Sequence, residues 1–179
     1  MTRLLYRNQR IELDVLSVKM NFKWTNKDHH LVDICLSAFM TNATEEIPSK
    51  HYFVFFANTT SPCSSVSRME KSNECKDTLL LDPSRIPSDI SQVHIVASLR
   101  NDRNQNFAQV TGSIFDIENS VSGEIIASYF FYGTFITETA IEIGTLFKEE
   151  GQWHFHFSDK RYETDLVYFL VKYYPRSLI

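Results

Sequence analysis

The sequence predicts an all-β protein, a sandwich of two mostly antiparallel sheets with one helix near the C-terminus. Apolar segments recur at short intervals, are joined by polar loops, and do not alternate with helical patterns as parallel βαβ units do. Aromatic residues make up 13% of the chain and only 5 residues are glycine, a composition that suits pleated, half-buried surfaces. We found neither a repeat nor a linker, so residues 1–179 are expected to form one domain.

Four strands are expected in the first half of the chain. Leu16–Trp24 alternates apolar and polar residues without a fault, which predicts a strand with one buried face. Leu31–Met40 and Tyr52–Phe56 are near-continuous apolar runs, which predict buried central strands. The short segment Leu79–Leu81 is also apolar, and the turn Asp82-Pro83-Ser84 follows it.

The second half predicts three further strands, a hairpin and the helix. The strands cover residues 93–99, 107–117 and 124–132. The hairpin runs from Ile141 to Phe157 through the turn Lys148–Gly151, where Gly151 can take the positive φ that such turns require. The helix is predicted by apolar residues at helical spacing between Asp165 and Pro175, namely Leu166, Phe169, Leu170 and Tyr173.

Charge and cysteine content restrict the class of protein. With 18 basic and 22 acidic residues the net charge is −4, which argues against nucleic acid or anionic lipid as a partner through bulk electrostatics. No apolar run is long enough to span a bilayer, and the first eight residues lack the apolar core of a signal peptide. Cys35, Cys63 and Cys75 form no disulfide or zinc pattern. A cytoplasmic protein with reduced thiols is therefore expected.

The sequence gives no argument for an enzyme. It contains no Gly-x-Ser-x-Gly elbow, no Walker-type loop and no Gly-x-Gly-x-x-Gly. An uncharacterised hydrolase would have only generic acidic residues and histidines in its favour. His154 and His156 lie two apart and would share a strand face, where they could bind a metal, but the sequence reveals no third ligand. A polar outer face of an edge hairpin is the favoured interpretation of this pair.

Oxygen-bearing side chains suggest one candidate metal site. Calcium binds six to eight oxygens, and a sandwich gathers its loops at its ends. Asp33, Asn58, Asn73, Glu74 and Asp77 lie at the ends of predicted strands or in the loop before Leu79. The segment Thr59–Asp77 also carries Arg68, Lys71 and Lys76, which partly cancel its acids. From the residues alone, a solvated loop is the favoured interpretation.

Several segments, in order, are similar to motifs of one protein family. The matching segments are Asp33–Phe39 (family Asp-Leu-Asp-Ala-Ser-Ala-Phe), Tyr52–Asn58 (Asp-Phe-Val-Phe-Tyr-Asn-Asn), Ser61–Val66 (Ser-Pro-Asp-Gly-Ser-Val), Leu81–Ile90, Phe107–Val110, Thr137–Ala140, Gly144–Phe147 and Gly151–Phe155. Together they identify the chain as resembling the TerD family of tellurium-resistance and stress-response proteins.

The resemblance implies a two-sheet β-sandwich with calcium bound by loops at one end. It also implies a role in resistance to tellurite, some phages and pore-forming colicins, in a bacterial cytoplasm and without an established enzymatic activity. Family members are thought to work as binding or scaffold modules beside membrane-located partners. The resemblance thus implies an unknown protein partner that is associated with the membrane.

The departures from the family motifs fall on the calcium ligands. Cys35, Tyr52 and Cys63 stand where the family has Asp, and the acidic, glycine-rich run shrinks to Met69–Asp77. Asn101 replaces a further family Asp. The oxygen ligands that remain are Asp33, Asn58, Asn73, Glu74, Asp77 and Asn101. Because each lost carboxylate removes donor oxygens and charge, calcium binding is predicted to be weak or absent.

A second hypothesis dispenses with metal altogether. The segment around residue 130 is too apolar for a strand with one exposed face. Its aromatic residues, which are Phe130, Phe131, Tyr132 and Phe135, would then form an exposed surface for a partner protein or a homodimer.

Overall fold

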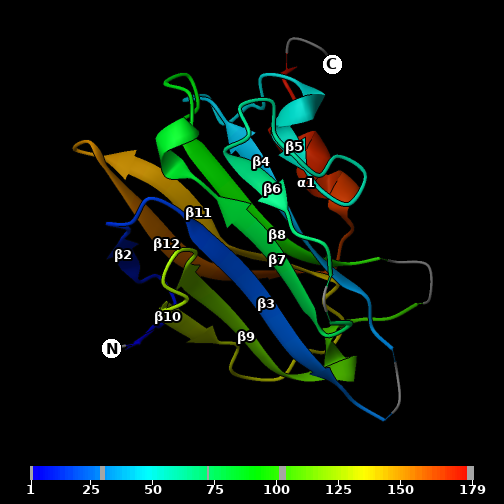
Figure 1. Ribbon diagram of the computed structural model, residues 1–179. Helices are drawn as coiled ribbons and strands as arrows, with labels where there is room; N and C mark the ends of the chain where they lie inside the picture. Colours follow the sequence, from blue (N-terminus) through cyan, green and yellow to red (C-terminus); the bar gives the residue numbers. More distant parts are fainter. Residues whose placement is uncertain (1, 29–30, 72, 101–103, 177–179) are drawn as a thin grey trace.

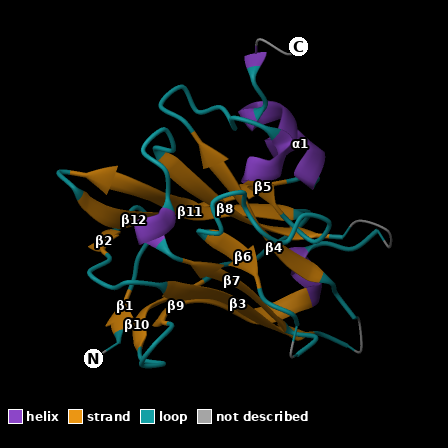
Figure 2. Cartoon of the chain, turned by 45° about the horizontal axis from the view of Figure 1, so that its top comes forward, coloured by secondary structure: helices purple, strands orange, loops and turns teal. Residues whose placement is uncertain are grey.

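The computed structural model describes residues 2–28, 31–71, 73–100 and 104–176, which form two six-stranded sheets packed face to face (Figures 1 and 2). The first sheet has the order β1 (Arg3–Leu4), β10 (Ile125–Phe130), β9 (Val110–Asn119), β3 (Val18–Asn26), β7 (Lys76–Leu81) and β6 (Val66–Arg68). The second has the order β2 (Arg10–Glu12), β12 (Gln152–Tyr162), β11 (Ala140–Glu149), β8 (Gln92–Leu99), β4 (Ile34–Thr41) and β5 (Phe53–Val54). All these neighbours pair antiparallel except β1 with β10, so the predicted fold class is confirmed.

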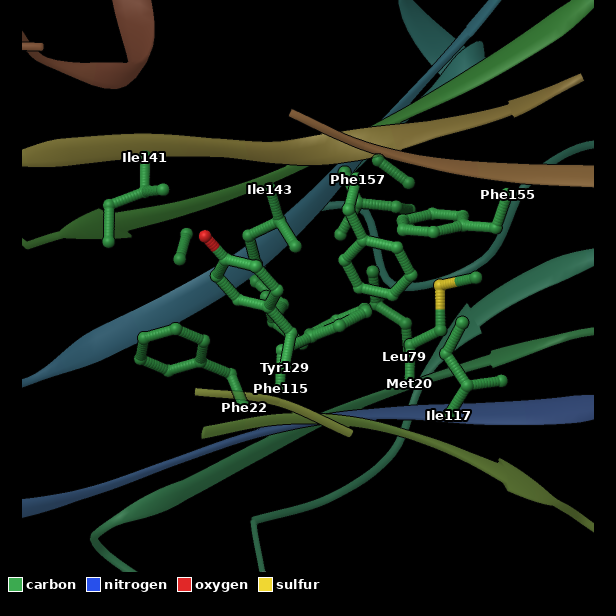
Figure 3. Close-up of a cluster of buried hydrophobic side chains, with 14 of the residues drawn as sticks. Met20, Phe22, Leu79, Phe115, Ile117, Tyr129, Ile141, Ile143, Phe155 and Phe157 are labelled. Carbon is green, nitrogen blue, oxygen red and sulfur yellow. The ribbon is translucent and has the colours of Figure 1, made fainter. Parts of the chain in front are cut away.

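The core lies between the two sheets and is rich in phenylalanine (Figure 3). Phe22 and Phe115 come from the first sheet, and Phe155 and Phe157 from the second. The ring of Phe115 lies 5.8 Å from each of the latter two rings, measured between centroids. The alternation along β3 places Met20, Phe22 and Trp24 in this core, as its sequence pattern predicts.

The helix α1 (Leu166–Tyr173) covers part of the outer face of the second sheet beside β5 (Figure 1). Its N-cap is Asp165, whose carboxylate accepts hydrogen bonds from the amides of Val167 and Tyr168. Phe169 and Tyr173 of the helix pack into a second apolar cluster. Because β4 thus has the core on one face and α1 near the other, all eight of its residues are buried.

The hairpin of β11 and β12 closes more tightly than the sequence predicts. Its loop consists of Glu150 and Gly151, with φ of 50° and 85°, as in a type I′ turn. The predicted positive φ of Gly151 is therefore confirmed, and Lys148 belongs to the strand. Upstream in β11, a register shift precedes Gly144, where a Cβ atom would overlap the carbonyl oxygen of His156.

The prediction of a central strand at Tyr52–Phe56 is wrong. The segment contributes only the two-residue β5 at the edge of the second sheet. Its aromatic residues are explained by ring stacking instead, because Phe53 stacks between Phe39 and Phe55 at 4.3 Å from each ring.

Short elements were also absent from the prediction. These are the edge strands β1, β2 and β6 and the 3₁₀ turns Lys50–Tyr52, Pro83–Arg85 and Phe107–Gln109. Strands of two or three residues carry too little alternation to recognise. Within the described residues, no helix has the length and apolarity that a membrane span needs.

Candidate functional site

Two of the predicted ligands line one cavity at an end of the sandwich. Asp33 immediately precedes β4 and Glu74 lies in the turn before β7. The cavity has a volume of about 250 Å³. Its lining residues are Asn26, Leu31, Val32, Asp33, Lys71, Glu74 and Gln105. The cavity therefore holds two carboxylates and one ammonium group.

Asp33 has cationic partners from its own chain. The Lys71 ammonium lies 2.6 Å from Oδ1 of Asp33 and also donates to the carbonyl oxygen of Ile34 at 3.1 Å. It lies 5.6 Å from the centre of the Trp24 ring, within the range of a cation–π contact. Arg100 approaches the other carboxylate oxygen at 3.7 Å. Both Asp33 and Lys71 are partly exposed, so this ion pair contributes under about 1 kcal/mol.

Asp77 forms a buried ion pair between the sheets. It lies on β7, and both carboxylate oxygens accept from one terminal nitrogen of Arg68 on β6, at 2.8 and 2.7 Å. Oδ2 also accepts from the backbone N–H of Leu36 on β4, at 2.7 Å. Asp77 thus connects the two sheets. Removal of either charged partner would leave the other buried and uncompensated.

Cys35 lies beside these ion pairs, at a position where the family has Asp. Its thiol is buried, and burial raises its pKa above the ordinary value for cysteine. The sulfur lies 4.0 Å from Oδ1 of Asp33. It therefore stands at this site as a neutral thiol.

The remaining predicted ligands do not join Asp33. Asn58 donates to the carbonyl oxygens of His51 and Phe53, at 3.0 and 2.7 Å, and lines a separate cavity beside α1. Asn73 accepts from the backbone N–H of Cys75 at 2.8 Å and shapes the turn before β7. Asn101 lies outside the described residues.

Two of the predicted calcium ligands, Asp33 and Asp77, already pair with cations of the same chain. Calcium needs six to eight oxygens, whereas both oxygens of Asp77 accept from Arg68, one of them also accepts from a backbone amide, and Asp33 faces Lys71. Within residues 2–28, 31–71, 73–100 and 104–176, no group of three or more His, Cys, Asp or Glu side chains is arranged to hold a metal ion. Arg68 and Lys71 dilute the acidic charge, as their place in the sequence predicts, and the structure shows that each cation pairs with one carboxylate.

The two histidines of the hairpin lie apart from the cavity. His154 stacks on Phe147 at 5.6 Å between ring centres, and His156 pairs with Arg10 of β2 in the sheet register. Burial, together with that arginine, lowers the pKa of His156. β12 is bordered by β2, so the hairpin itself is not the edge of the sheet.

The aromatic segment around residue 130 is divided between core and surface. Phe131 packs against the core, with its ring 5.4 Å from that of Phe22, and Phe135 is buried. Phe130 and Tyr132 keep substantial exposure. The prediction that four aromatic rings form an exposed surface is therefore wrong for Phe131 and Phe135, because both pack in the core.

An acidic residue that the sequence did not single out organises the other side of the sandwich. Asp159, on β12, has a φ of 45° and is buried. Its carboxylate accepts from Tyr129 at 2.8 Å and from Arg7 and Arg161 at 3.2 and 2.9 Å. Burial and this carboxylate together raise the pKa of Tyr129 to about 12. Nothing in its local sequence distinguishes Asp159 from an exposed strand residue.

The chain is similar in sequence to a known protein family and to individual members of it. A family model described as TerD domain matches residues 1–173. The chain is 25% identical over 148 residues to tellurium resistance protein TerD of Serratia marcescens, covering 79% of this chain and 77% of that one. It is 26% identical over 182 residues to general stress protein 16U of Bacillus subtilis (strain 168), covering 93% and 94%.

The solved structures agree on the fold. A crystal structure of a protein of unknown function superposes with a TM-score of 0.72 at 20% identity, covering 90% of this chain and 99% of that one. That of a homologue of telluride resistance protein (TerD) from Streptomyces coelicolor A3(2) superposes with a TM-score of 0.66 at 16% identity, covering 87% and 95%. With the match over residues 1–173 and the shared sandwich, this chain belongs to the TerD family.

Proposed function

We propose that this protein is a non-enzymatic binding or scaffold module that protects cells against tellurite or similar toxic agents. The names of its relatives support the role, since they include tellurium resistance protein TerD, general stress protein 16U and, over 82 residues at 28% identity, chemical-damaging agent resistance protein B of Clostridium acetobutylicum. These names describe resistance and stress rather than a catalysed reaction. We place its action in the cytoplasm, because its three cysteines are unpaired thiols. Its partner would be an unidentified protein associated with the membrane.

We further propose that the calcium site of the family is degenerate in this chain and that calcium binds weakly or not at all. The observation that carries this proposal is the buried pair of Arg68 and Asp77. The guanidinium supplies at this carboxylate the positive charge that calcium would otherwise supply, and burial prevents exchange with a solvent ion. Asp33 and Glu74 alone offer too few oxygens for a tight site.

Thermal unfolding tests the metal proposal. The full chain is stripped with chelator, then heated with and without millimolar calcium, with magnesium as the control. Calcium at about 100 times its dissociation constant would stabilise the native state by about 2.7 kcal/mol, a rise of several degrees in Tm. We expect no calcium-specific rise. A rise of several degrees with calcium but not magnesium would refute the proposal.

A Lys71→Gln variant separates the contributions of the two pairs. It removes the closer of the two cationic partners of Asp33 and leaves both Arg100 and the pair of Arg68 and Asp77 in place, so we expect at most a small calcium response. A response as large as that of a tight site would show that Lys71 alone blocks the metal and that Asp77 is unimportant.

The stress role is tested separately in cells. A bacterial strain from which the gene has been deleted should stop growing at a lower tellurite concentration than its parent does. The wild-type gene should restore the tolerance of the parent. Equal tolerance in both strains, with verified expression in the parent, would contradict a resistance role.

A further inference from the structure

The helix α1 is apolar on both sides. Phe169 and Tyr173 face the second sheet and are buried. On the other side, Val167 and Val171 are 60% and 61% exposed, which is unusual for two aliphatic residues one helical turn apart. A helix of only eight residues that is apolar around most of its circumference, with Lys172 as its one charged residue, is typical of one that is covered by another element.

Two recesses adjoin this exposed strip, and the segment after β5 contributes to the walls of both. One, of about 490 Å³, separates α1 from the segment after β5 and is lined by Phe53, Phe55, Leu170 and Tyr174 among others. The second, of about 290 Å³, includes Phe56, Leu99, Leu166 and Val167 in its walls. The ridge formed by Val167 and Val171, together with two largely apolar recesses beside it, has the shape of a contact surface between proteins.

The charges at the two ends of α1 complement each other. Glu163 lies shortly before Leu166, the first residue of α1. Arg176 lies at the same sequence separation after Tyr173, the last residue. Both are exposed, and neither forms an ion pair within the part of the chain that the structure describes. If a second α1 packs antiparallel on the first, Glu163 of each copy lies near Arg176 of the other. The two helix dipoles then point in opposite directions, which is the favourable arrangement. A parallel arrangement would place like charges together.

We propose that the occupant of this surface is a second copy of the chain, with the two α1 helices antiparallel about a two-fold axis. The valine ridge of each copy lies beside Leu170 and Tyr174 of the other, and Glu163 of each faces Arg176 of the partner subunit. A stable dimer buries about 800 Å² per subunit, more than the outer side of an eight-residue helix provides, so the walls of both recesses take part. This association depends neither on the stress role nor on the metal site.

Sedimentation equilibrium of the full chain, from about 1 to 200 µM, tests the proposal. We expect a monomer–dimer equilibrium within this range and a dissociation constant at least about tenfold higher for Val171→Glu, because the substitution places two carboxylates near the two-fold axis. The matched control is Val121→Glu, at a valine that is 80% exposed in the turn between β9 and β10, and it should dimerise as the wild type does. Unfolding curves establish that each variant is folded.

Charge exchange tests the antiparallel orientation. Glu163→Arg and Arg176→Glu should each weaken the dimer about three- to tenfold, and the double variant should recover most of the loss. A wild type that stays monomeric at 200 µM, or equal dimerisation of Val171→Glu and Val121→Glu, would overturn the proposal. The proposal would also be overturned if the protein is monomeric and floats with phosphatidylglycerol vesicles, and if Val171→Glu abolishes that flotation. The ridge would then contact a membrane. Failure of the double variant to recover would overturn the antiparallel arrangement.

Discussion

The two sheets have outer faces of opposite character. On the first sheet, polar side chains from neighbouring strands pair across the face, with Lys19 bound to Glu118 at 3.1 Å and Lys23 to Asp116 at 2.5 Å. On the second sheet, α1 covers an aromatic cluster that includes Phe39 and Phe169. The first face is stable against water as it stands, whereas the second is complete only with the helix in place. Substitutions on the two faces should therefore differ greatly in their cost.

The largest effect is expected at Phe169, which is fully buried under α1 with its ring 5.3 Å from that of Tyr162. Phe169→Ala should lower the free energy of unfolding by about 3–5 kcal/mol through lost burial and the cavity left behind. Denaturant unfolding measures the change. Phe169→Leu, which keeps most of the volume, is the control and should cost clearly less. If the alanine variant costs under about 1 kcal/mol, α1 does not hold the second face.

A polar residue lies within the covered face. His94 is buried on β8, where its two ring nitrogens share hydrogen bonds with the hydroxyls of Thr41 and Thr145, each at 3.1 Å. Its ring stacks on Tyr173 of α1 at 4.4 Å between centres. A charge on His94 would therefore arise directly beneath the helix.

Acid should destabilise this face through His94. Burial lowers the pKa of His94 from 6.5 to about 4. The positive charges of Lys172 and Lys160 also lower this pKa, whereas the negative charge of Glu142 raises it. Because the unfolded chain takes up the proton first, stability is intact above pH 6.5 and falls as the pH drops towards 4, by about 3 kcal/mol. Denaturant unfolding between pH 7 and 4 should show this slope, and His94→Gln should reduce it. The exposed His51 is the control, and His51→Gln should keep the wild-type slope. Equal slopes in all three proteins would contradict the assignment.

The smallest effect is expected on the open face. Lys19→Met removes an ion pair that is partly solvated, so the free energy of unfolding should change by under about 1 kcal/mol. The difference from wild type should shrink further in 1 M salt, which screens the pair. A loss comparable to that of Phe169→Ala would mean that the two faces do not differ in the way described.

The same contrast explains how far the sequence could predict the molecule. The open face alternates polar and apolar residues, so β3 and the sandwich itself were predictable. The covered face removes the alternation, because Phe53 is apolar on account of its stacking on Phe39. The sequence therefore predicts a central strand where the structure has a two-residue edge strand. At the candidate site, sequence identified Asp33 and Glu74, which share a cavity. It could not place Asn58 elsewhere or pair Arg68 with Asp77, because these contacts depend on the turn after β5 and on the register of β6 against β7, which the local sequence does not specify.

The ion pairs at Asp33 and Asp77 also bear on when the protein can act. Lys71 and Arg68 are part of the same polypeptide as the carboxylates they neutralise, so their local concentration is set by the chain and not by the cell. A bound ion would make this end of the sandwich respond to changes in ion level. If calcium is absent here, as we propose, cations supplied by the protein's own side chains give this end its form once, on folding, and changes in ion level leave it unaltered.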